Sequence, residues 1–141
     1  MKNRKIEDTS TRWHVLGDPE AVAVQAVQRI LQAASRAITG RSLFRIVLAG
    51  GRTPEAAYRL LVDADTDWSR WEIYFGDERC LPVDDAERNS LMAARALLDS
   101  VAVPAANVHP ILGWRAGERL PIAEIGRPAQ VDVLLDKAAQ A

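Results

Sequence analysis

Apolar residues recur along the chain with two different spacings, and the longer spacing predicts a helix near the N-terminus. Between Asp18 and Gly40, small and aliphatic side chains recur every three or four residues, which is the period of an amphipathic α-helix. Asp18 is followed by Pro19, and an acidic N-cap residue before proline is a typical helix start. Gly40 is a typical helix stop. We therefore expect a helix that ends at Gly40 and covers one side of a core.

Shorter apolar runs predict strands. They span residues 13–16, 43–49, 71–75 and 108–112. The run 43–49 is almost continuously apolar, which is typical of a strand covered on both faces, as in a parallel sheet. Two further helices are expected between these strands, one beginning at Thr53-Pro54 and one capped by Ser90 and continuing through Leu98. Strands that alternate with helices predict an α/β fold with a largely parallel sheet flanked by helices.

The two ends of the chain differ from this alternating pattern. Residues 1–11 are polar and predict a flexible arm. Residues 113–141 are interrupted by glycine and proline, and only 131–135 resembles an ordered apolar element. The prediction is one domain over residues 1–112, followed by an atypical tail over 113–141 that is disordered or frame-disrupted.

Composition narrows the classes of function. With 141 residues, 48% hydrophobic and 26% charged, the chain is typical of a single globular domain. A formal net charge of -1 provides no global field to recruit nucleic acid or an anionic membrane. Cys80 is the only cysteine, which rules out an intrachain disulfide and a zinc-thiolate cluster. No apolar stretch resembles a signal peptide or a membrane span, so we expect a cytoplasmic protein.

The first segment with candidate chemistry is the glycine loop Gly50–Thr53. A predicted buried strand leads into Gly50 and Gly51, which can adopt positive φ and let a ligand approach the backbone. Thr53 would cap the next helix, whose N-terminal N–H groups favour an anion, most often a phosphate. Arg52 adds a charged donor. The segment is neither a Walker loop nor a dinucleotide fingerprint. The alternative is a tight turn with a solvent-facing arginine.

The second segment, Asp77-Glu78-Arg79, follows the strand predicted over 71–75. Ligands of open α/β sheets bind at the carboxyl ends of strands, so this segment and the glycine loop should face one crevice. Arg79 would hold a phosphate or carboxylate, and Asp77 would orient a hydroxyl or water, or share in proton transfer. The alternative is a solvated cluster of charges that pair with one another.

Together these segments resemble the 6-phosphogluconolactonase family. The matching motifs are G-G-R-T-P at 50–54 and W-x-x-W-E-I-Y-F-G-D-E-R at 68–79, followed by Asn89, Leu97-Leu98 and Asn107-Val108-His109. The resemblance covers residues 12–112. Glucosamine-6-phosphate deaminases share the fold and a G-G-S-T-P loop, but normally continue with F-N-M-D-E-Y. This chain has F-G-D-E-R over 75–79, so the lactonase family is preferred.

The resemblance implies a fold related to the deaminases and ribose-5-phosphate isomerases. It also implies hydrolysis of 6-phosphoglucono-1,5-lactone to 6-phosphogluconate in the pentose phosphate pathway, without a metal or organic cofactor. Asp77 would hold the reacting end of the substrate, and Arg79 would contact phosphate or ring oxygens. The substrate phosphate would be cradled by Gly50, Gly51, Arg52 and Thr53.

The sequence also departs from the family. Lactonases carry a G-x-G-x-D-G-H segment whose histidine is taken to activate water, and no such segment occurs in these 141 residues. We therefore expect a member truncated on its C-terminal side, with little or no lactonase activity. His14 and His109 are expected to have structural or surface roles. Arg88 stands where the family often has a small residue, which weakens any role for Asn89.

Two other functions compete with the lactonase. One is a non-catalytic module that binds sugar phosphates, and the other is an inactive fragment that associates through an exposed sheet edge.

Overall fold

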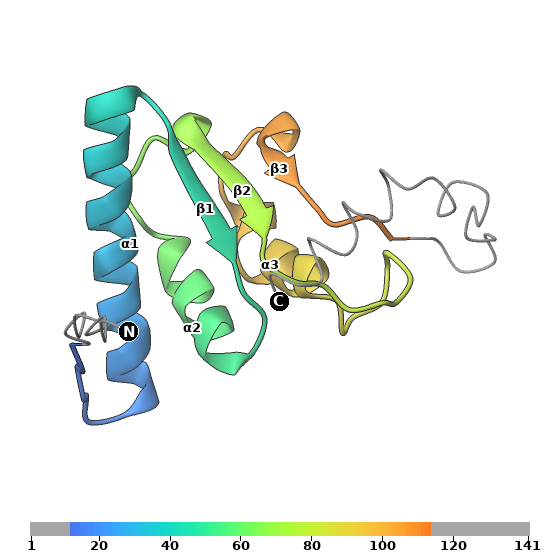
Figure 1. Cartoon of the computed structure of the whole chain (residues 1–141), viewed down its shortest axis with the longest axis horizontal. Coiled ribbons are helices and arrows are strands. Elements are labelled where there is room, and N and C mark those ends of the chain that lie inside the picture. Colours follow the sequence, from blue (N-terminus) through green and yellow to red (C-terminus); the bar gives the residue numbers. More distant parts are fainter. Residues whose placement is uncertain (1–11, 114–141) are drawn as a thin grey trace, which may run out of the picture.

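The computed structural model describes residues 12–113, which form a parallel sheet with helices packed against it (Figure 1). The sheet has three strands in the order β1-β2-β3. Their bounds are Phe44–Leu48 for β1, Trp71–Phe75 for β2 and Val108–His109 for β3. Both pairings are parallel, with Leu48 opposite Phe75 at the carboxyl ends of β1 and β2. The segments that follow these two strands therefore leave the sheet at the same edge, as the alternating pattern predicts.

Helix α1 spans Pro19–Arg41 and begins as expected. The Asp18 carboxylate accepts a hydrogen bond from the backbone N–H of Ala21 at 2.7 Å, which is the contact of an N-cap residue. The predicted end is wrong, because Gly40 lies within the helix and Ser42 adopts the left-handed C-cap conformation with a φ of 62°. The Ser42 N–H donates to the carbonyl of Ile38 at 2.9 Å, so the last turn continues past the glycine.

Helices α2 (Arg52–Leu61) and α3 (Asn89–Ala96) follow β1 and β2. Thr53 and Ser90 were expected to cap them, but each is the second helical residue, and the N-cap residues are Gly51 and Arg88. Gly51 has no side chain that could cap α2, and the Arg88 side chain forms no capping hydrogen bond to α3. Helix α3 also ends two residues before Leu98. Short 3-10 turns complete the described part of the fold: Trp68–Arg70, Leu98–Ser100 and Ala105–Asn107.

All three helices pack on one face of the sheet. Strand residues Phe44, Leu48 and Ile73 contact small and aliphatic side chains of the helices in a single core cluster. Trp71 is fully buried at its centre, stands edge-on to Phe44 with ring centroids 4.7 Å apart, and donates from its indole nitrogen to the Thr66 hydroxyl at 3.0 Å. This core fixes the strands and thereby the loops that leave their carboxyl ends.

Within residues 12–113 the opposite face of the sheet is open, which contradicts the expectation that β1 is covered on both faces. Val47 is 64% exposed, and Arg45 forms an ion pair there with Glu72 at 3.0 Å. Tyr74 stacks on His109 with ring centroids 4.6 Å apart. Although the run is almost continuously apolar, its side chains alternate between the buried and the open face of the sheet.

Residues 13–16 do not form the predicted strand. Trp13 is 84% and Val15 is 89% exposed, and the segment joins none of the pairings of the described sheet. Within residues 12–113 this segment has no strand to pair with, and its side chains do not enter the core. The predicted arm over 1–11 and all but the first residue of the predicted tail lie outside the described residues. No helix within 12–113 is long and apolar enough to cross a membrane.

Candidate functional site

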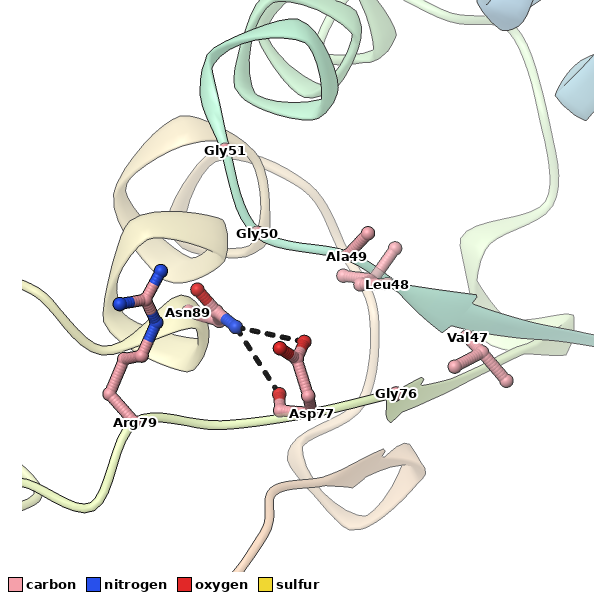
Figure 2. A pocket seen from close by; sticks show the side chains of 9 residues that line it. All are labelled: Val47, Leu48, Ala49, Gly50, Gly51, Gly76, Asp77, Arg79 and Asn89. Atoms are coloured by element: carbon pink, nitrogen blue, oxygen red, sulfur yellow. Dashed lines mark hydrogen bonds between the residues drawn. The ribbon is translucent and has the colours of Figure 1, made fainter. Parts of the chain in front are cut away.

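A hollow of about 420 Å³ opens at the carboxyl ends of β1 and β2 (Figure 2). Its lining residues are Val47, Leu48, Ala49, Gly50, Gly51, Gly76, Asp77, Arg79 and Asn89. It thus brings together four predicted site residues from the two loops: Gly50, Gly51, Asp77 and Arg79. The other two, Arg52 and Thr53, do not line the hollow; they are exposed on the first turn of α2.

The entrance to the glycine loop is fixed by Tyr58 of α2. Its hydroxyl accepts a hydrogen bond from the Ala49 N–H at 2.8 Å and donates one to the Ala49 carbonyl at 2.9 Å. The Tyr58 side chain packs in the core, and this burial raises its pKa, although the hydrogen bond from Ala49 acts in the opposite direction. A neutral tyrosine therefore ties the residue that precedes the glycine pair to the middle of α2.

The glycine loop leaves several backbone donors available at the start of α2. Gly51 has a φ of 103°, a conformation that glycine adopts without strain, and it turns the chain into the helix. The first helical hydrogen bond runs from the Glu55 N–H to the Gly51 carbonyl at 3.1 Å. The N–H groups of Gly51, Arg52 and Thr53 precede this bond, and no described protein group accepts from them. Together with the helix dipole they can hold an anion.

Asn89, the first residue of α3, joins the two loops. Its Nδ2 donates to the Asp77 carboxylate at 3.1 Å and to the Asp77 carbonyl at 3.3 Å (Figure 2). On the other side its amide lies against Gly50: a β-carbon on Gly50 would come within 2.1 Å of Asn89 Oδ1. Gly50 is therefore required for close approach rather than for positive φ, and Asn89 fixes the direction of the Asp77 carboxylate.

Glu78, between Asp77 and Arg79, is a structural residue. Its carboxylate accepts hydrogen bonds from the backbone N–H groups of Asn89 at 2.6 Å, Ser90 at 2.9 Å and Arg79 at 2.8 Å. Burial acts to raise the Glu78 pKa, but the hydrogen bonds from Ser90, Arg79 and Asn89 outweigh it, so the pKa lies below its usual value. The ionised carboxylate thus caps α3 from a distant segment, which holds Asp77 and Arg79 at the hollow.

Arg88 is buried beside Glu78, and each side chain is only 2% exposed. Their closest charged atoms are 3.5 Å apart, and the Arg88 guanidinium also donates to the carbonyls of Leu81 and Ile111, each at 2.9 Å. Arg88, which stands where the family often has a small residue, points into these buried contacts, and Asn89 still lines the hollow. The expectation that Arg88 weakens a role for Asn89 has no support in this geometry.

Neither histidine lines the hollow. His14 is exposed in the segment before α1, and His109 stacks on Tyr74 on the open face of the sheet. Cys80 is exposed as well. Residues 12–113 contain no cluster of side chains that could hold a metal ion. Among the described residues that line the hollow, Asp77 and Arg79 are the ionisable ones, and they provide a carboxylate and a cation.

Two residues that shape the site were not among the predicted ones. Tyr58 carries a weak signal, since a tyrosine on the apolar side of a helix needs a partner for its hydroxyl. Asn89 belongs to the matched pattern, but its contact with Gly50 joins segments far apart in sequence. No spacing in the sequence indicates that contact.

Comparisons with known proteins agree with this architecture. The family model described as glucosamine-6-phosphate isomerases/6-phosphogluconolactonase matches residues 17–127. A 6-phosphogluconolactonase of Nostoc sp. is 35% identical over 97 residues, covering 69% of this chain and 40% of that protein. One from Mycobacterium tuberculosis is 36% identical over 104 residues, covering 72% and 42%. This chain therefore spans about two fifths of the length of these relatives.

The fold is shared with solved structures as well. The crystal structure of 6-phosphogluconolactonase from Thermotoga maritima matches with a TM-score of 0.68 at 25% identity, covering 86% of this chain and 52% of that one. Three observations support the same family. They are the parallel sheet flanked by helices, the G-G-R-T-P loop beside the D-E-R loop, and the family-model match over residues 17–127. The chain belongs to the glucosamine-6-phosphate isomerase/6-phosphogluconolactonase family.

Proposed function

We propose that residues 12–113 form the phosphate-binding part of a 6-phosphogluconolactonase site. The observation that carries this proposal is the meeting of two anion-binding features at one hollow. The N-terminus of α2 presents backbone N–H groups beside Gly51, and Arg79 approaches from the loop after β2. A phosphate is the anion best suited to several N–H donors and a guanidinium group at once.

The hollow suggests a division of roles. The phosphate would lie at the edge of the hollow beside the first turn of α2. There it would accept hydrogen bonds from the N–H group of Gly51, which lines the hollow, and from those of Arg52 and Thr53, with Arg79 as the charged partner. Asp77, held by Asn89, would face the sugar and orient its reacting end. The Arg52 side chain, exposed on the first turn of α2, would add positive charge near the loop rather than a contact inside the hollow.

The described residues account for binding of a sugar phosphate but not for hydrolysis of the lactone. Lactone hydrolysis needs a group that activates water, and neither histidine of the described part lines the hollow. Loss of a general base typically costs about 10² to 10⁴ in rate. We therefore propose that the 141-residue chain binds the sugar phosphate and hydrolyses the lactone slowly or not at all, acting in the cytoplasm. A non-catalytic sugar-phosphate-binding module is the second candidate, and the absence of a histidine from the described lining favours it.

Thermal unfolding of the 141-residue chain tests the binding claim. A ligand at 100 times its Kd stabilises the folded state by about 2.7 kcal/mol. 6-Phosphogluconate should raise the Tm, whereas gluconate, which lacks the phosphate, should not. Arg79→Ala should abolish the shift. Arg95→Ala, which removes an exposed arginine from α3, should retain it. An equal shift with gluconate, or an unchanged shift in Arg79→Ala, contradicts the proposal.

A lactone hydrolysis assay, corrected for spontaneous ring opening, tests the claim about chemistry. Turnover close to that of full-length family members would overturn the expectation of weak activity. Turnover near background together with a ligand-induced rise in Tm supports the binding module.

A further inference from the structure

Asn89 occupies a position in the hollow that the proposed roles of the phosphate loop do not explain. Its side chain is largely buried, with only 6% of the residue exposed. Its Nδ2 is committed to Asp77 through two hydrogen bonds. Because both partners of this nitrogen are acceptors, the orientation of the amide is fixed: the NH₂ group faces Asp77 and the oxygen faces the other way.

The amide oxygen is available to a ligand. Figure 2 shows Asn89 Oδ1 turned away from Asp77, and it lies against Gly50 of the phosphate loop. Every fully buried side-chain nitrogen or oxygen in residues 12–113 has a hydrogen-bond partner, whereas no described group donates to this oxygen. Asn89 Oδ1 is therefore not enclosed in the core but reaches the hollow, which Asn89 lines. An acceptor that reaches the hollow without a protein donor favours a ligand that can donate.

We propose that Asn89 is a specificity-determining residue of the site, which accepts a hydrogen bond from a hydroxyl of the bound sugar through Oδ1 while Nδ2 positions Asp77. This inference rests on the proposed function, since it needs the phosphate to be held at the glycine loop beside Asn89. Its consequence is selectivity. A phosphate without a sugar would use the loop and Arg79 only, whereas a sugar phosphate would also use Asn89.

Isothermal titration calorimetry with two probes, 6-phosphogluconate and inorganic phosphate, tests this inference in the 141-residue chain. The wild type should bind 6-phosphogluconate more tightly. Asn89→Ala should weaken 6-phosphogluconate about tenfold, the size expected for one or two hydrogen bonds, and should change the Kd of inorganic phosphate by less than about twofold. Asn89→Ser, a smaller truncation, should show the same selective loss if the alanine variant folds poorly.

Asn107→Ala is the matched control. The Asn107 amide also donates to two acceptors, the carbonyls of Ser69 and Trp71, but at the opposite end of β2. This variant should retain both affinities. Equal loss of both ligands in the Asn89 variants, or no loss of either, overturns the inference and leaves the phosphate loop intact. A wild-type chain that binds neither probe refutes the proposed function, and the inference fails with it.

Discussion

Replacement of Gly50 by alanine tests whether the glycine loop and α3 are packed as described. Gly50 does not have a positive φ, so alanine causes no backbone strain there. The new β-carbon would lie 2.1, 2.6 and 2.9 Å from Oδ1, Cγ and Nδ2 of Asn89, which are its nearest neighbours. All three distances are shorter than a van der Waals contact, and all three atoms belong to one side chain.

The loss of stability can be estimated from the side chain that the new β-carbon displaces. Asn89 has to leave its place and lose its two hydrogen bonds to Asp77, each worth about 0.5–1.5 kcal/mol. Overpacking of a well-filled site costs about 1–3 kcal/mol. The reduced freedom of the unfolded chain returns about 0.4–1 kcal/mol. Together these three contributions predict that Gly50→Ala lowers the free energy of unfolding by about 1–5 kcal/mol.

A double-mutant cycle separates this clash from other effects. Asn89→Ala removes all three clashing atoms, so Gly50→Ala should be close to neutral on that background. The expected coupling energy is nearly the whole cost of Gly50→Ala in the wild type, at least about 1 kcal/mol, measured by urea unfolding of the wild type, both single variants and the double variant. Additive effects within about 0.5 kcal/mol would show that Asn89 does not pack against Gly50, which would refute the reasoning.

Three further changes test other contacts. Tyr58→Phe removes both hydrogen bonds to Ala49 and should lower the free energy of unfolding by about 1–2 kcal/mol in urea; wild-type stability would contradict the proposed tie. Gly51→Ala meets no close atom but forces alanine to a φ of 103° and a ψ of 170°, a backbone conformation adopted almost only by glycine, so we expect a loss of about 1–3 kcal/mol in the same assay. The pKa of Glu78 is lowered by folding, so its stabilising contribution is present above the ordinary value of 4.5 and disappears as the pH falls through the folded-state pKa. Urea unfolding between pH 6 and pH 3 should therefore show a shallower loss of stability in Glu78→Gln. The hydrogen bond from Arg45 also lowers the pKa of Glu72, but this ion pair is solvent-screened, so Glu72→Gln should change the profile less than Glu78→Gln.

Sequence patterns correctly predicted those features of the fold that depend only on interactions between neighbouring residues. Asp18 and Pro19 fixed the start of α1, because capping and proline geometry involve only neighbouring residues. The apolar run at 13–16 was misinterpreted, since an apolar pattern does not reveal whether a strand has a partner to pair with. The open face beside Val47 was missed for a similar reason. Hydrophobic character alone does not show on which side the helices pack.

The candidate site likewise has features that the sequence predicted and features that it did not. The rule that loops at the carboxyl ends of parallel strands share a crevice correctly brought Gly50 and Gly51 together with Asp77 and Arg79. It did not indicate that Arg52 lies outside the hollow, because the direction of a side chain on the first helical turn depends on where the helix begins.

Asn89 and the buried pair of Glu78 and Arg88 depend on tertiary packing. The packing of α3 sets the contact of Asn89 with Gly50. Arg88 has no local sequence signal for burial, since a single arginine before a helix is usually exposed. Its partners are carbonyls contributed by residues on either side of it in sequence, at Leu81 and Ile111.

Backbone amide chemical shifts provide the most direct test of the claim that the glycine loop holds a phosphate. Titration of ¹⁵N-labelled chain with 6-phosphogluconate should move the amide signals of Gly51, Arg52 and Thr53 most, because their N–H groups would donate to the phosphate. Signals of Thr66 and Asp67, which line a separate hollow beside α1, should stay in place. Unmoved signals for the three loop amides at saturating ligand, or the largest shifts at Thr66 and Asp67, would contradict the account.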